Sequence, residues 1–476
     1  MDPNSSTKSI MLDGARLQLS GVQFDSRKIK KGDLFVAVPG MEADGHDYIR
    51  EAIKAGAACV AGERNLTDLP VPYYRVPNAR AALAQIAGQL YDHPSTRHTM
   101  IGITGTNGKT TTAHILQHIA EQAGLTCSLI GTVSNRINGI EMPSSQTTPD
   151  ALQLQQWLNE SRDQAVIMEV SSHGIDQDRV GSIDYDYALF TNLTHDHLDY
   201  HKTMDRYFQT KARLFDQIKQ PGEAIISSRC QWGNRLIEKL QGQNRNVRTF
   251  GQTDRDHLQI LRVLQEADLQ FEVQDGDTRY EIKMPLPGMY NAWNAAAAWL
   301  TARRMGIEPA VIQEALRGFP GVPGRFEVYP HPRGAKFVVD YAHTPDGFQQ
   351  FLRTLHLHKP KRIIHIFGFR GRGDPSKRRL MLEISAAWSD LIILTLDNLQ
   401  GVPAESMTAE LQELAKQLGR HLAVVIEDRT KAIQYAWNRV SQGDYVAITG
   451  KGREPYEKPF ALPCRTDQHT IEYLSF

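Results

Sequence analysis

The stretch Ile101–Thr112, which reads I-G-I-T-G-T-N-G-K-T-T-T, decides how this chain is expected to fold. It begins with an apolar run that is typical of a buried strand. A glycine-rich turn then leads to Lys109 and Thr110, after which apolar residues recur at helical spacing until Gly124. A strand, a glycine-rich turn, a Lys-Thr pair and a helix follow one another in this order in phosphate-binding loops.

Each residue type in the loop has a chemical use. Glycines let backbone N–H groups approach phosphate oxygens without a Cβ in the way, and the N-terminus of the next helix attracts the same anion. Lys109 can reach the terminal phosphates, and the hydroxyl of Thr110 can bind Mg²⁺. The strict pattern has glycine where this chain has Ile103, so the loop is a variant. An ordinary glycine-containing turn is the alternative, which the Lys-Thr pair disfavours. We predict an ATP site made of Gly105, Thr106, Asn107, Gly108, Lys109, Thr110 and Thr111.

The composition disfavours several classes of protein. Lys plus Arg and Asp plus Glu number 54 each, so no net field attracts nucleic acid or an anionic membrane. The four cysteines are widely spaced and form no C-x-x-C pair, which disfavours a zinc site and a disulfide framework. The first residues lack the apolar core of a signal peptide, and no apolar run approaches the roughly 20 residues of a membrane span. We expect a cytoplasmic monomer without a membrane span or a nucleic-acid partner.

The chain is expected to be α/β throughout, with about three domains for its 476 residues. Residues 1–93 are predicted to form a small α/β domain. Residues 94–323 alternate strand and helix patterns, which favours a mostly parallel sheet around the phosphate loop. Residues 324–476 are predicted to form a Rossmann-like α/β domain. The glycine- and proline-rich stretch Gly318–Arg325 between them is the expected hinge. The expected strands include Val166–Val170, Tyr187–Leu193, Phe337–Asp340, Ile363–Phe367, Leu391–Thr395, Ala423–Ile426 and Tyr445–Ile448.

Several polar residues lie where they could act beside this loop. Glu169 ends an apolar strand and is a candidate Mg²⁺ ligand, because hard cations prefer carboxylate oxygen. The segment Asn192–His201, N-L-T-H-D-H-L-D-Y-H, is disfavoured as a zinc site by the lack of a second cluster. Its histidines could be metal ligands near the phosphates or structural hydrogen-bonding residues. The sequence of this segment does not decide between the two roles. Lys211 lies on the amphipathic stretch Tyr207–Phe215, and composition alone places it at the surface. In Asp340–Asp346, D-Y-A-H-T-P-D, the leading acid suits a ribose hydroxyl.

Taken together, these segments resemble the Mur ligases, and among them the UDP-N-acetylmuramoyl-tripeptide synthetases. The resemblance covers nearly the whole chain. Its motifs, besides the loop and the histidine-rich segment, are Asp25–Arg27, Gly32–Ala37, Glu169–Gly174, Gly324–Glu327, Asp340–Asp346 and Gly450–Gly452. It implies an ATP-dependent ligase that phosphorylates a carboxylate and lets an amine attack the acyl phosphate. The implied carboxylate is UDP-MurNAc-L-Ala-D-Glu, the amine is that of an amino acid, and the product belongs to peptidoglycan-precursor synthesis.

The resemblance also assigns residues by position. As metal ligands it implies Thr110, Glu169, His197 and Lys211, the lysine as a carbamate formed with CO₂ that steadies a second Mg²⁺. Its implied catalytic residues are Lys109, Lys211 and His197, and Asn291, Arg325 and Asp340 match further nucleotide positions. The UDP-linked substrate is assigned to Phe24, Ser26, Met41–Ala43, Gln146, Thr147, Thr148, Ser171, Gln177 and Arg179. The amino acid is assigned to Asp397, Asn398, Gln400, Gly450, Arg453 and Glu454.

The departures from the family lie where the amino acid binds. The D-N-P-R segment is Asp397–Gln400 here, G-G-D-R-D is Arg370–Asp374, and G-K-G-H-E is Gly450–Glu454. Gln400 and Gly373 therefore stand where arginines usually do. A charge-assisted bond from arginine to a carboxylate contributes roughly 1.5–3 kcal/mol, so we predict that meso-diaminopimelate is a poor substrate. Added arginines would repel the terminal ammonium of lysine, which favours a neutral or acidic amino acid. They are Arg370, Arg372 and Arg453.

Two other functions compete with this one. The first is a related ligase that joins a different carboxylate and amine outside peptidoglycan synthesis. The second is a nucleotide-binding regulator without catalysis. The retention of the second-metal residues disfavours the regulator, because a protein that only binds nucleotide does not need them. The residues concerned are Lys109, Thr110, Glu169, His197 and Lys211.

Overall fold

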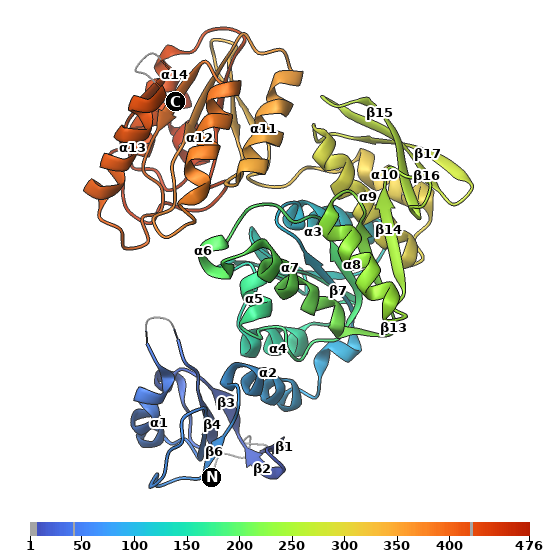
Figure 1. The fold of residues 1–476 in the computed structure, drawn as a ribbon, viewed down its shortest axis with the longest axis vertical. Coiled ribbons are helices and arrows are strands. Elements are labelled where there is room, and N and C mark those ends of the chain that lie inside the picture. Colours follow the sequence, from blue (N-terminus) through green and yellow to red (C-terminus); the bar gives the residue numbers. More distant parts are fainter. Residues whose placement is uncertain (1–6, 41–42, 419–421) are drawn as a thin grey trace. The chain divides into compact units, whose positions relative to one another are not determined.

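The computed structural model describes residues 7–40, 43–418 and 422–476. The chain divides into two compact units. One comprises Met1–Thr104, Gly124–Ala188 and Thr210–Ala224, and the other Gly105–Ala123, Leu189–Gln209 and Ile225–Phe476. Helices and strands alternate along most of the chain, so the α/β class is confirmed (Figure 1). No described helix is long and apolar enough to cross a membrane.

The N-terminal part contains a four-stranded parallel sheet. Its strand order is β3 (Gly21–Gln23), β4 (Asp33–Ala37), β5 (Cys59–Gly62), β6 (Tyr73–Arg75). One face packs against helix α2 (Ala79–Leu90) and the hairpin β1 (Lys8–Leu12)–β2 (Ala15–Leu19), and the other against α1 (Ile49–Ala55). Because both faces are covered, β4 is buried along its whole length and reads as a continuous apolar run after Asp33.

The central sheet has eleven strands, with parallel pairs at its centre. Strand β7 (Thr99–Thr104) pairs with β11 (Ala165–Glu169), which pairs with β8 (Cys127–Ile130), all in parallel. The full order is β10 (Ile140–Pro143), β9 (Ser134–Ile137), β8, β11, β7, β12 (Tyr185–Phe190), β13 (Ile218–Ser227), β14 (Val247–Gly251), β15 (Leu258–Gln265), β16 (Leu269–Asp275), β17 (Thr278–Met284). The pairs β10–β9, β9–β8, β15–β16 and β16–β17 are antiparallel, which the sequence pattern did not indicate.

Helices of this region carry or support the predicted site residues. Helix α3 (Lys109–Gln122) begins at the phosphate loop and packs against α9 (Met289–Arg304) and α10 (Pro309–Arg317). Helix α7 (Met204–Ala212) carries Lys211 and is followed by a 3₁₀ turn over Arg213–Gln217, so the expected helix starts and ends three residues earlier. The remaining helices are α4 (Ala151–Glu160), α5 (Ser172–Asp176), α6 (Leu198–His201) and α8 (Gln231–Gly242).

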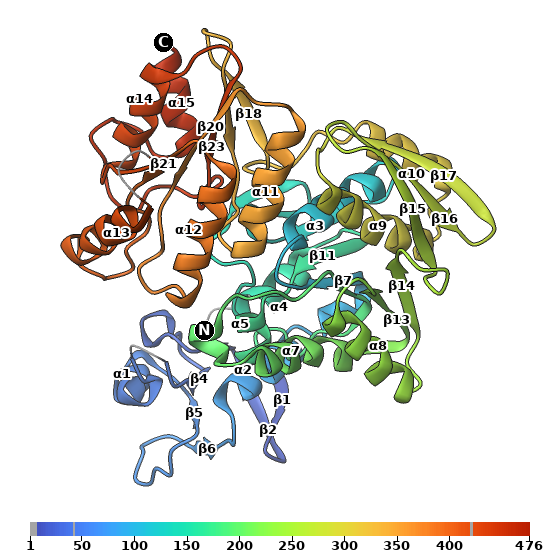
Figure 2. The same cartoon turned by 45° about the horizontal axis from the view of Figure 1, so that its top comes forward.

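The C-terminal part is a six-stranded sheet covered on both faces. Its order is β18 (Glu327–Pro330), β19 (Lys336–Val339), β23 (Asp444–Ile448), β20 (Arg362–Phe367), β21 (Leu391–Leu394), β22 (Ala423–Val425), parallel except for β18. Helices α11 (Pro345–Leu357), α12 (Ser376–Trp388) and α13 (Ala404–Leu418) pack on one face, and α14 (Arg429–Arg439) and α15 (Asp467–Ser475) on the other (Figure 2). The expected Rossmann-like arrangement is confirmed, and the five expected strands are present within a residue or two.

Two buried polar groups lie inside this C-terminal layer. His365 on β20 has no exposed surface, and its ring nitrogens contact the hydroxyls of Ser385 at 2.8 Å and Thr449 at 2.9 Å. Burial lowers the pKa of His365 to about 3, with the nearby Arg429 acting in the same direction. Arg429 and Asp467, both fully buried, join α14 to α15 through hydrogen bonds of 2.7 and 2.8 Å.

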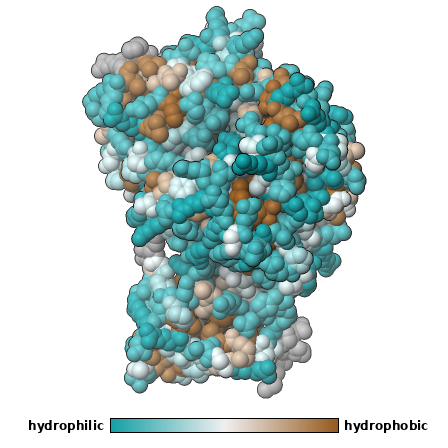
Figure 3. Space-filling view, turned by 45° about the vertical axis from the view of Figure 1, so that its right-hand side comes forward, coloured by the Kyte–Doolittle hydropathy of each residue, from teal (hydrophilic) through white to brown (hydrophobic). Residues whose placement is uncertain are grey.

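The face of the molecule drawn in Figure 3 is mainly hydrophilic. On the face drawn in Figure 3, hydrophobic residues lie in separate patches between hydrophilic ones. Large exposed hydrophobic side chains are spread over the described chain, from Met11 through Ile140 and Leu264 to Phe476. Single exposed hydrophobic residues are normal and need no partner to explain them.

Candidate functional site

The phosphate loop has the backbone that the sequence predicts. Gly105 and Gly108 both have positive φ, +145° and +86°. A Cβ on Gly105 would collide with the hydroxyl of Thr191, and one on Gly108 with the side-chain oxygen of Asn294. Helix α3 begins immediately afterwards at Lys109, whose Nζ donates to the carbonyl oxygens of Gly105 at 2.9 Å and Thr106 at 3.0 Å. Only glycine fits both positions without displacing these neighbours.

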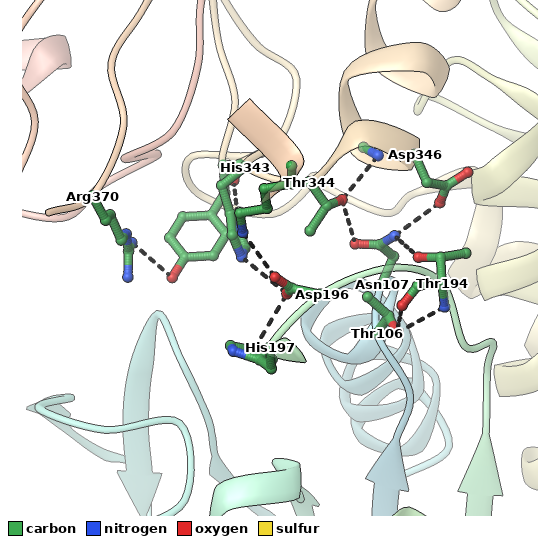
Figure 4. A network of polar contacts seen from close by, with 12 residues as sticks. Thr106, Asn107, Thr194, Asp196, His197, His343, Thr344, Asp346 and Arg370 are labelled. Atoms are coloured by element: carbon green, nitrogen blue, oxygen red, sulfur yellow. Dashed lines mark hydrogen bonds and ion pairs between the residues drawn. The ribbon is translucent and has the colours of Figure 1, made fainter. Parts of the chain in front are cut away.

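The segment after β12 fixes the shape of this loop. The N–H of Thr106 donates to the carbonyl of Asn192 at 2.9 Å, and the N–H of Asn107 donates to the Asn192 side chain at 3.0 Å. The Thr191 hydroxyl donates to the Asn107 carbonyl at 2.7 Å, and the N–H of Thr194 donates to the Thr106 hydroxyl at 3.0 Å (Figure 4). The strand therefore ends at Phe190, before the predicted end at Leu193, because the next residues bind the loop.

Asn107 and Thr110 also contact the C-terminal segment of the same unit. The amide of Asn107 donates to the carboxylate of Asp346 at 2.8 Å (Figure 4). The guanidinium of Arg325 donates to the hydroxyl of Thr110 at 3.1 Å and lies 4.2 Å from the centre of the Tyr341 ring. Two residues assigned to ATP, Thr110 and Arg325, are thus brought together.

The other residues assigned to the nucleotide have mainly structural partners. Asp340 accepts from the backbone N–H groups of Phe326 at 2.8 Å and Ala342 at 2.7 Å. Burial raises the pKa of Asp340, and the charge of Arg325 opposes that rise. The amide of Asn291 donates to the Pro287 carbonyl at 2.7 Å. Asn291 is buried, and Thr111 is buried in the first turn of α3.

Asp196, which sequence reasoning did not single out, is the centre of a charged group. It is buried, and Lys377 donates to it at 2.8 Å. The imidazoles of His197 and His343 lie 3.3 and 3.8 Å from its other oxygen (Figure 4). Burial alone would raise the pKa of Asp196, but the charges of His197, Lys377 and His343 outweigh burial and lower it. His197 itself has a left-handed backbone, φ +53°, and is 41% exposed. The signal was available, since Asp196 lies between two histidines.

Glu169 and the residues assigned to the muramoyl dipeptide form one hydrogen-bonded group, here called the acid-side cluster. The Glu169 carboxylate, 1% exposed, accepts from the backbone N–H of Thr132 at 2.8 Å and from its hydroxyl at 3.0 Å. Thr132 in turn contacts the hydroxyl of Thr147 at 3.1 Å. The members of the cluster are Thr132, Gln146, Thr147, Thr148, Glu169, Ser171, Gln177 and Arg179.

Arg179 connects the rest of the acid-side cluster. It donates to the Gln177 side chain at 2.7 Å, to the Thr148 carbonyl at 2.7 Å and to the Gln146 side chain. The hydroxyl of Thr148 lies 3.2 Å from that of Ser171 and donates to the Glu169 carbonyl at 3.0 Å. The six residues assigned by resemblance, of which Arg179 is one, therefore form a single hydrogen-bonded group with the buried carboxylate of Glu169.

The remaining residues assigned to the UDP-linked substrate lie in the N-terminal part. Ser26 is buried at the start of a 3₁₀ turn that Asp25 caps by accepting from the N–H of Arg27. Phe24 is 36% exposed, which leaves its ring accessible to a planar ligand. Ala43 is exposed, while Met41 and Glu42 lie outside the described residues.

Lys211 is not a surface residue. It is 1% exposed, so the placement expected from composition alone is wrong. Its Nζ lies 3.4 Å from the hydroxyl of Thr104, the last residue of β7 before the phosphate loop. On α7 it follows the buried Tyr207 and Phe208 by four and three residues, which places it on the apolar face of the helix. That spacing was readable in the sequence.

The residues assigned to the amino acid lie beyond the ends of neighbouring parallel strands. Asp397 follows β21 and is buried beside Lys451, whose Nζ donates to it at 3.0 Å and also to the side chain of Asn398. Burial raises the pKa of Asp397, but the charges of Lys451, Arg429 and Arg370 outweigh burial and lower it to about 2.

Glu454 is paired within the chain. Its carboxylate accepts from Arg370 at 2.6 Å and from the hydroxyl of Tyr341 at 2.8 Å. We call Tyr341, Arg370, Asp397, Lys451 and Glu454 the amine-side cluster.

The positions that differ from the family motifs also contact other groups of the chain. The Gln400 side-chain oxygen accepts from the backbone N–H of Arg372 at 3.2 Å, and its own backbone is left-handed with φ +48°. Arg453 donates to Glu327 at 2.9 Å. Gly450, with φ +105°, lies so close to Asp397 that a Cβ would come within 3.1 Å of its carboxylate. The added arginines at 370 and 453 are therefore balanced by acids of the chain itself.

Among the described residues, no group of three or more His, Cys, Asp or Glu side chains could hold a metal ion. The oxygen chemistry of the candidates nevertheless suits Mg²⁺, since hard cations prefer carboxylate oxygens such as those of Glu169. A bound Mg²⁺ would also need oxygens from other groups, such as phosphate.

Three family models match the chain in the expected order. Residues 18–91 match the catalytic domain of the Mur ligase family, residues 103–302 the Mur ligase middle domain, and residues 324–452 the glutamate ligase domain of Mur ligases.

Proteins of similar sequence extend over almost the whole chain. A protein of Syntrophomonas wolfei is 37% identical, covering 92% of this chain and 91% of its own. One of Caldanaerobacter subterraneus is 38% identical over 93% and 91%, and one of Aquifex aeolicus 38% over 96% and 93%. All three are named UDP-N-acetylmuramoyl-L-alanyl-D-glutamate–2,6-diaminopimelate ligase. A solved structure of a ligase of that name is 27% identical, covers 98% of both chains and has a TM-score of 0.68. An ADP complex of the MurF ligase of Thermotoga maritima, 21% identical with a TM-score of 0.64, shares the fold over 90% of this chain and 93% of its own.

Proposed function

Because this chain belongs to the Mur ligase family, we propose that it joins an amino acid to UDP-MurNAc-L-Ala-D-Glu at the expense of ATP. The reaction belongs to peptidoglycan-precursor synthesis. The observation that carries the choice of acid is the acid-side cluster, since the six residues assigned by resemblance to the muramoyl dipeptide, Arg179 included, form one hydrogen-bonded group with Glu169. An arginine with neighbouring hydroxyl and amide groups suits a substrate that ends in a carboxylate.

The chemistry proceeds in two steps. A carboxylate oxygen of the acid attacks the γ-phosphorus of ATP, ADP leaves, and an acyl phosphate forms. The amine nitrogen of the amino acid then attacks the acyl carbon, phosphate leaves with the bonding electrons, and the nitrogen loses a proton. Phosphorylation is needed because an ionised carboxylate is a poor electrophile and has no good leaving group.

The chain's own residues position the phosphates in the first step. Gly105 and Gly108 allow the left-handed backbone of the loop, and α3 begins directly after it, so the helix N-terminus can face the phosphates. Lys109 would move from the loop carbonyls that it now contacts to the terminal phosphates. Asn291, Arg325 and Asp340 are assigned to the rest of the nucleotide.

Mg²⁺ would neutralise phosphate charge when bound, with Thr110, Glu169 and His197 as its proposed ligands. We assign Lys211 as a carbamate. Its burial supports that role, because an ammonium group is costly to bury away from water, whereas a carbamate can bind a cation.

The amino acid is proposed to differ from the diaminopimelate named for the relatives. Gln400 and Gly373 lack the charge that would bind a distal carboxylate, and the oxygen of Gln400 is already used by the backbone of Arg372. An unpaired substrate carboxylate would cost about 1–3 kcal/mol, which is roughly a tenfold to hundredfold loss in kcat/KM.

Phosphate release tests both parts of the proposal. The assay contains ATP, Mg²⁺, UDP-MurNAc-L-Ala-D-Glu and one amino acid from a panel of meso-diaminopimelate, L-lysine, L-alanine, L-serine and L-glutamate, with products identified by mass. A tripeptide product with at least one amino acid supports the ligase. No product with any of them, but product with another acid, supports the related ligase outside peptidoglycan synthesis. If meso-diaminopimelate is best by tenfold, the argument from Gln400 and Gly373 is wrong.

A further inference from the structure

We infer that Arg370 is a built-in counter-ion that fills the place of a substrate ammonium, so that the amino acid joined by this chain has an uncharged side chain. The inference rests on the proposed ligase function and names its substrate class. Arg370 stands at the first glycine of the family's G-G-D-R-D segment, so its side chain is an addition to the site.

The acids of the amine-side cluster are already neutralised by groups of the chain. Glu454 accepts from Arg370 on one oxygen and from the Tyr341 hydroxyl on the other. Asp397 accepts from Lys451 at 3.0 Å. An ammonium on the side chain of the substrate would have to displace Arg370 or Lys451 to gain an anionic partner.

Arg370 is held in place by its neighbours. Its carbonyl accepts from Arg378 at 3.0 Å, and the N–H of the following Gly371 donates to the carbonyl of Asn398 at 3.0 Å. Its guanidinium lies 5.7 Å from the centre of the Tyr341 ring. Burial lowers the pKa of Arg370, but the charges of Glu454 and Asp397 act against burial and the pKa is raised. A fixed cation repels a second cation more effectively than a mobile one, because it cannot move away at little cost.

The pair of Arg370 and Glu454 remains within reach of a substrate. The side chains of Arg370 and Glu454 are 28% and 29% exposed. The residues lie beyond the ends of β19, β23, β20 and β21, four neighbouring strands of one parallel sheet, and ligands of such sheets bind at that edge. The Nε–H of Arg370, by contrast, is buried and has no acceptor among the described residues.

The same ion pairs narrow the preference from a neutral or acidic amino acid to an uncharged one. Two of the three added arginines are balanced, since Arg370 pairs with Glu454 and Arg453 with Glu327. At these two pairs, neither a distal ammonium nor a distal carboxylate finds an unmatched opposite charge. An uncharged side chain meets no such penalty.

The test compares the ratio of kcat/KM for L-lysine to that for L-alanine in the wild type and in Arg370→Gly, with UDP-MurNAc-L-Ala-D-Glu and ATP saturating. We expect the wild type to prefer L-alanine or L-serine over L-lysine, meso-diaminopimelate and L-glutamate. Arg370→Gly should raise the lysine-to-alanine ratio about tenfold or more, because it frees Glu454 to accept from an ammonium. Adding Glu454→Gln to Arg370→Gly should remove that gain.

Two controls keep the result interpretable. Arg370→Met removes the charge but keeps the bulk, and it should raise the ratio in the same direction. Arg379→Met, on an exposed arginine of α12 that pairs with Glu383, should leave the ratio unchanged. A wild type that prefers L-lysine, meso-diaminopimelate or L-glutamate would overturn the inference, and so would folded Arg370 variants with an unchanged ratio. The absence of any tripeptide product would instead overturn the ligase proposal, so the two failures differ.

Discussion

Lys211 illustrates what a single residue reveals that composition hides. Composition alone places this lysine at the surface, yet it is 1% exposed. Its burial can be inferred from its spacing from Tyr207 and Phe208, which lie on the buried face of α7. Family resemblance pointed to Lys211, and helical geometry explains why it is inside.

Replacement of Lys211 by alanine is expected to leave ligation nearly inactive. A proposed carbamate would be lost, and with it a ligand for the second Mg²⁺. Added acetate or formate should partly restore phosphate release, because a small carboxylate can occupy the space of the carbamate. The control is the same titration of wild type, which should show no stimulation. A fully active Lys211→Ala would remove Lys211 from the metal set.

Lys109→Ala should lower ATP turnover about a hundredfold or more, since a cation directed at developing phosphate charge contributes on that scale. The chain should stay folded, because the Lys109 side chain donates to carbonyls of its own loop and is not part of the hydrophobic core. Phosphate release and thermal unfolding of the same preparation measure both. Near-normal turnover would contradict the assignment of the phosphate loop.

At the level of elements, strands with two buried faces were the easiest to predict. The β20 and β21 runs are almost entirely apolar, and their observed bounds lie within a residue of the expected ones. Strands β15, β16 and β17 were missed because each buries one face only and carries polar residues on the other. In β15, bulges at Ile260/Arg262 and Val263/Gln265 also interrupt the alternation of buried and exposed side chains.

The candidate site was predictable only in part for a similar reason. The glycines, Lys109 and Thr110 are adjacent in sequence, so a local pattern identifies them. The partners of Asp196 come from residues 343 and 377, and those of Glu454 from residues 341 and 370. No local pattern contains such pairs, since the topology of the sheet brings them together.

Strand β20 is expected to make stability depend on pH. The folded-state pKa of His365 is lowered to about 3, whereas an unfolded histidine titrates near 6.5. The stability that neutral His365 contributes is complete above pH 6.5 and falls as the pH drops toward 3, because the unfolded chain takes up a proton that the folded chain excludes. The slope for one group is about 1.4 kcal/mol per pH unit.

Urea unfolding at pH 7.5 and 5.5 measures this slope. His365→Asn cannot take up the proton, so its free energy of unfolding should change less between the two pH values, whatever its stability at pH 7.5. An equally steep change in the variant would show that other groups carry the acid sensitivity.

At the scale of the whole molecule, the domain boundaries near residues 93 and 323 remain predictions. The stretch Gly318–Arg325 contains Gly321 and Gly324 with φ of +91° and +71°, values that restrict substitution. If this stretch is a hinge, the amine and the acyl phosphate are brought together by domain closure, which also excludes water.

Small-angle scattering tests this expectation. The radius of gyration should decrease when a non-hydrolysable ATP analogue, Mg²⁺ and UDP-MurNAc-L-Ala-D-Glu are added together, and forward scattering should correspond to a monomer of 53.6 kDa. Nucleotide alone is the control and should produce a smaller change. Identical profiles in all states would count against closure.

The position of the amine-side cluster at strand ends has an evolutionary consequence. Arg370, Gly373 and Gln400 lie on loops beyond β20 and β21, and none of them belongs to the hydrophobic core clusters of the C-terminal sheet. Such positions can change charge by a single codon while the sheet beneath them stays intact. The choice of amine is therefore the property that can diverge fastest between descendants of one ancestral ligase, while the inherited machinery for activating the acid stays under its older constraints.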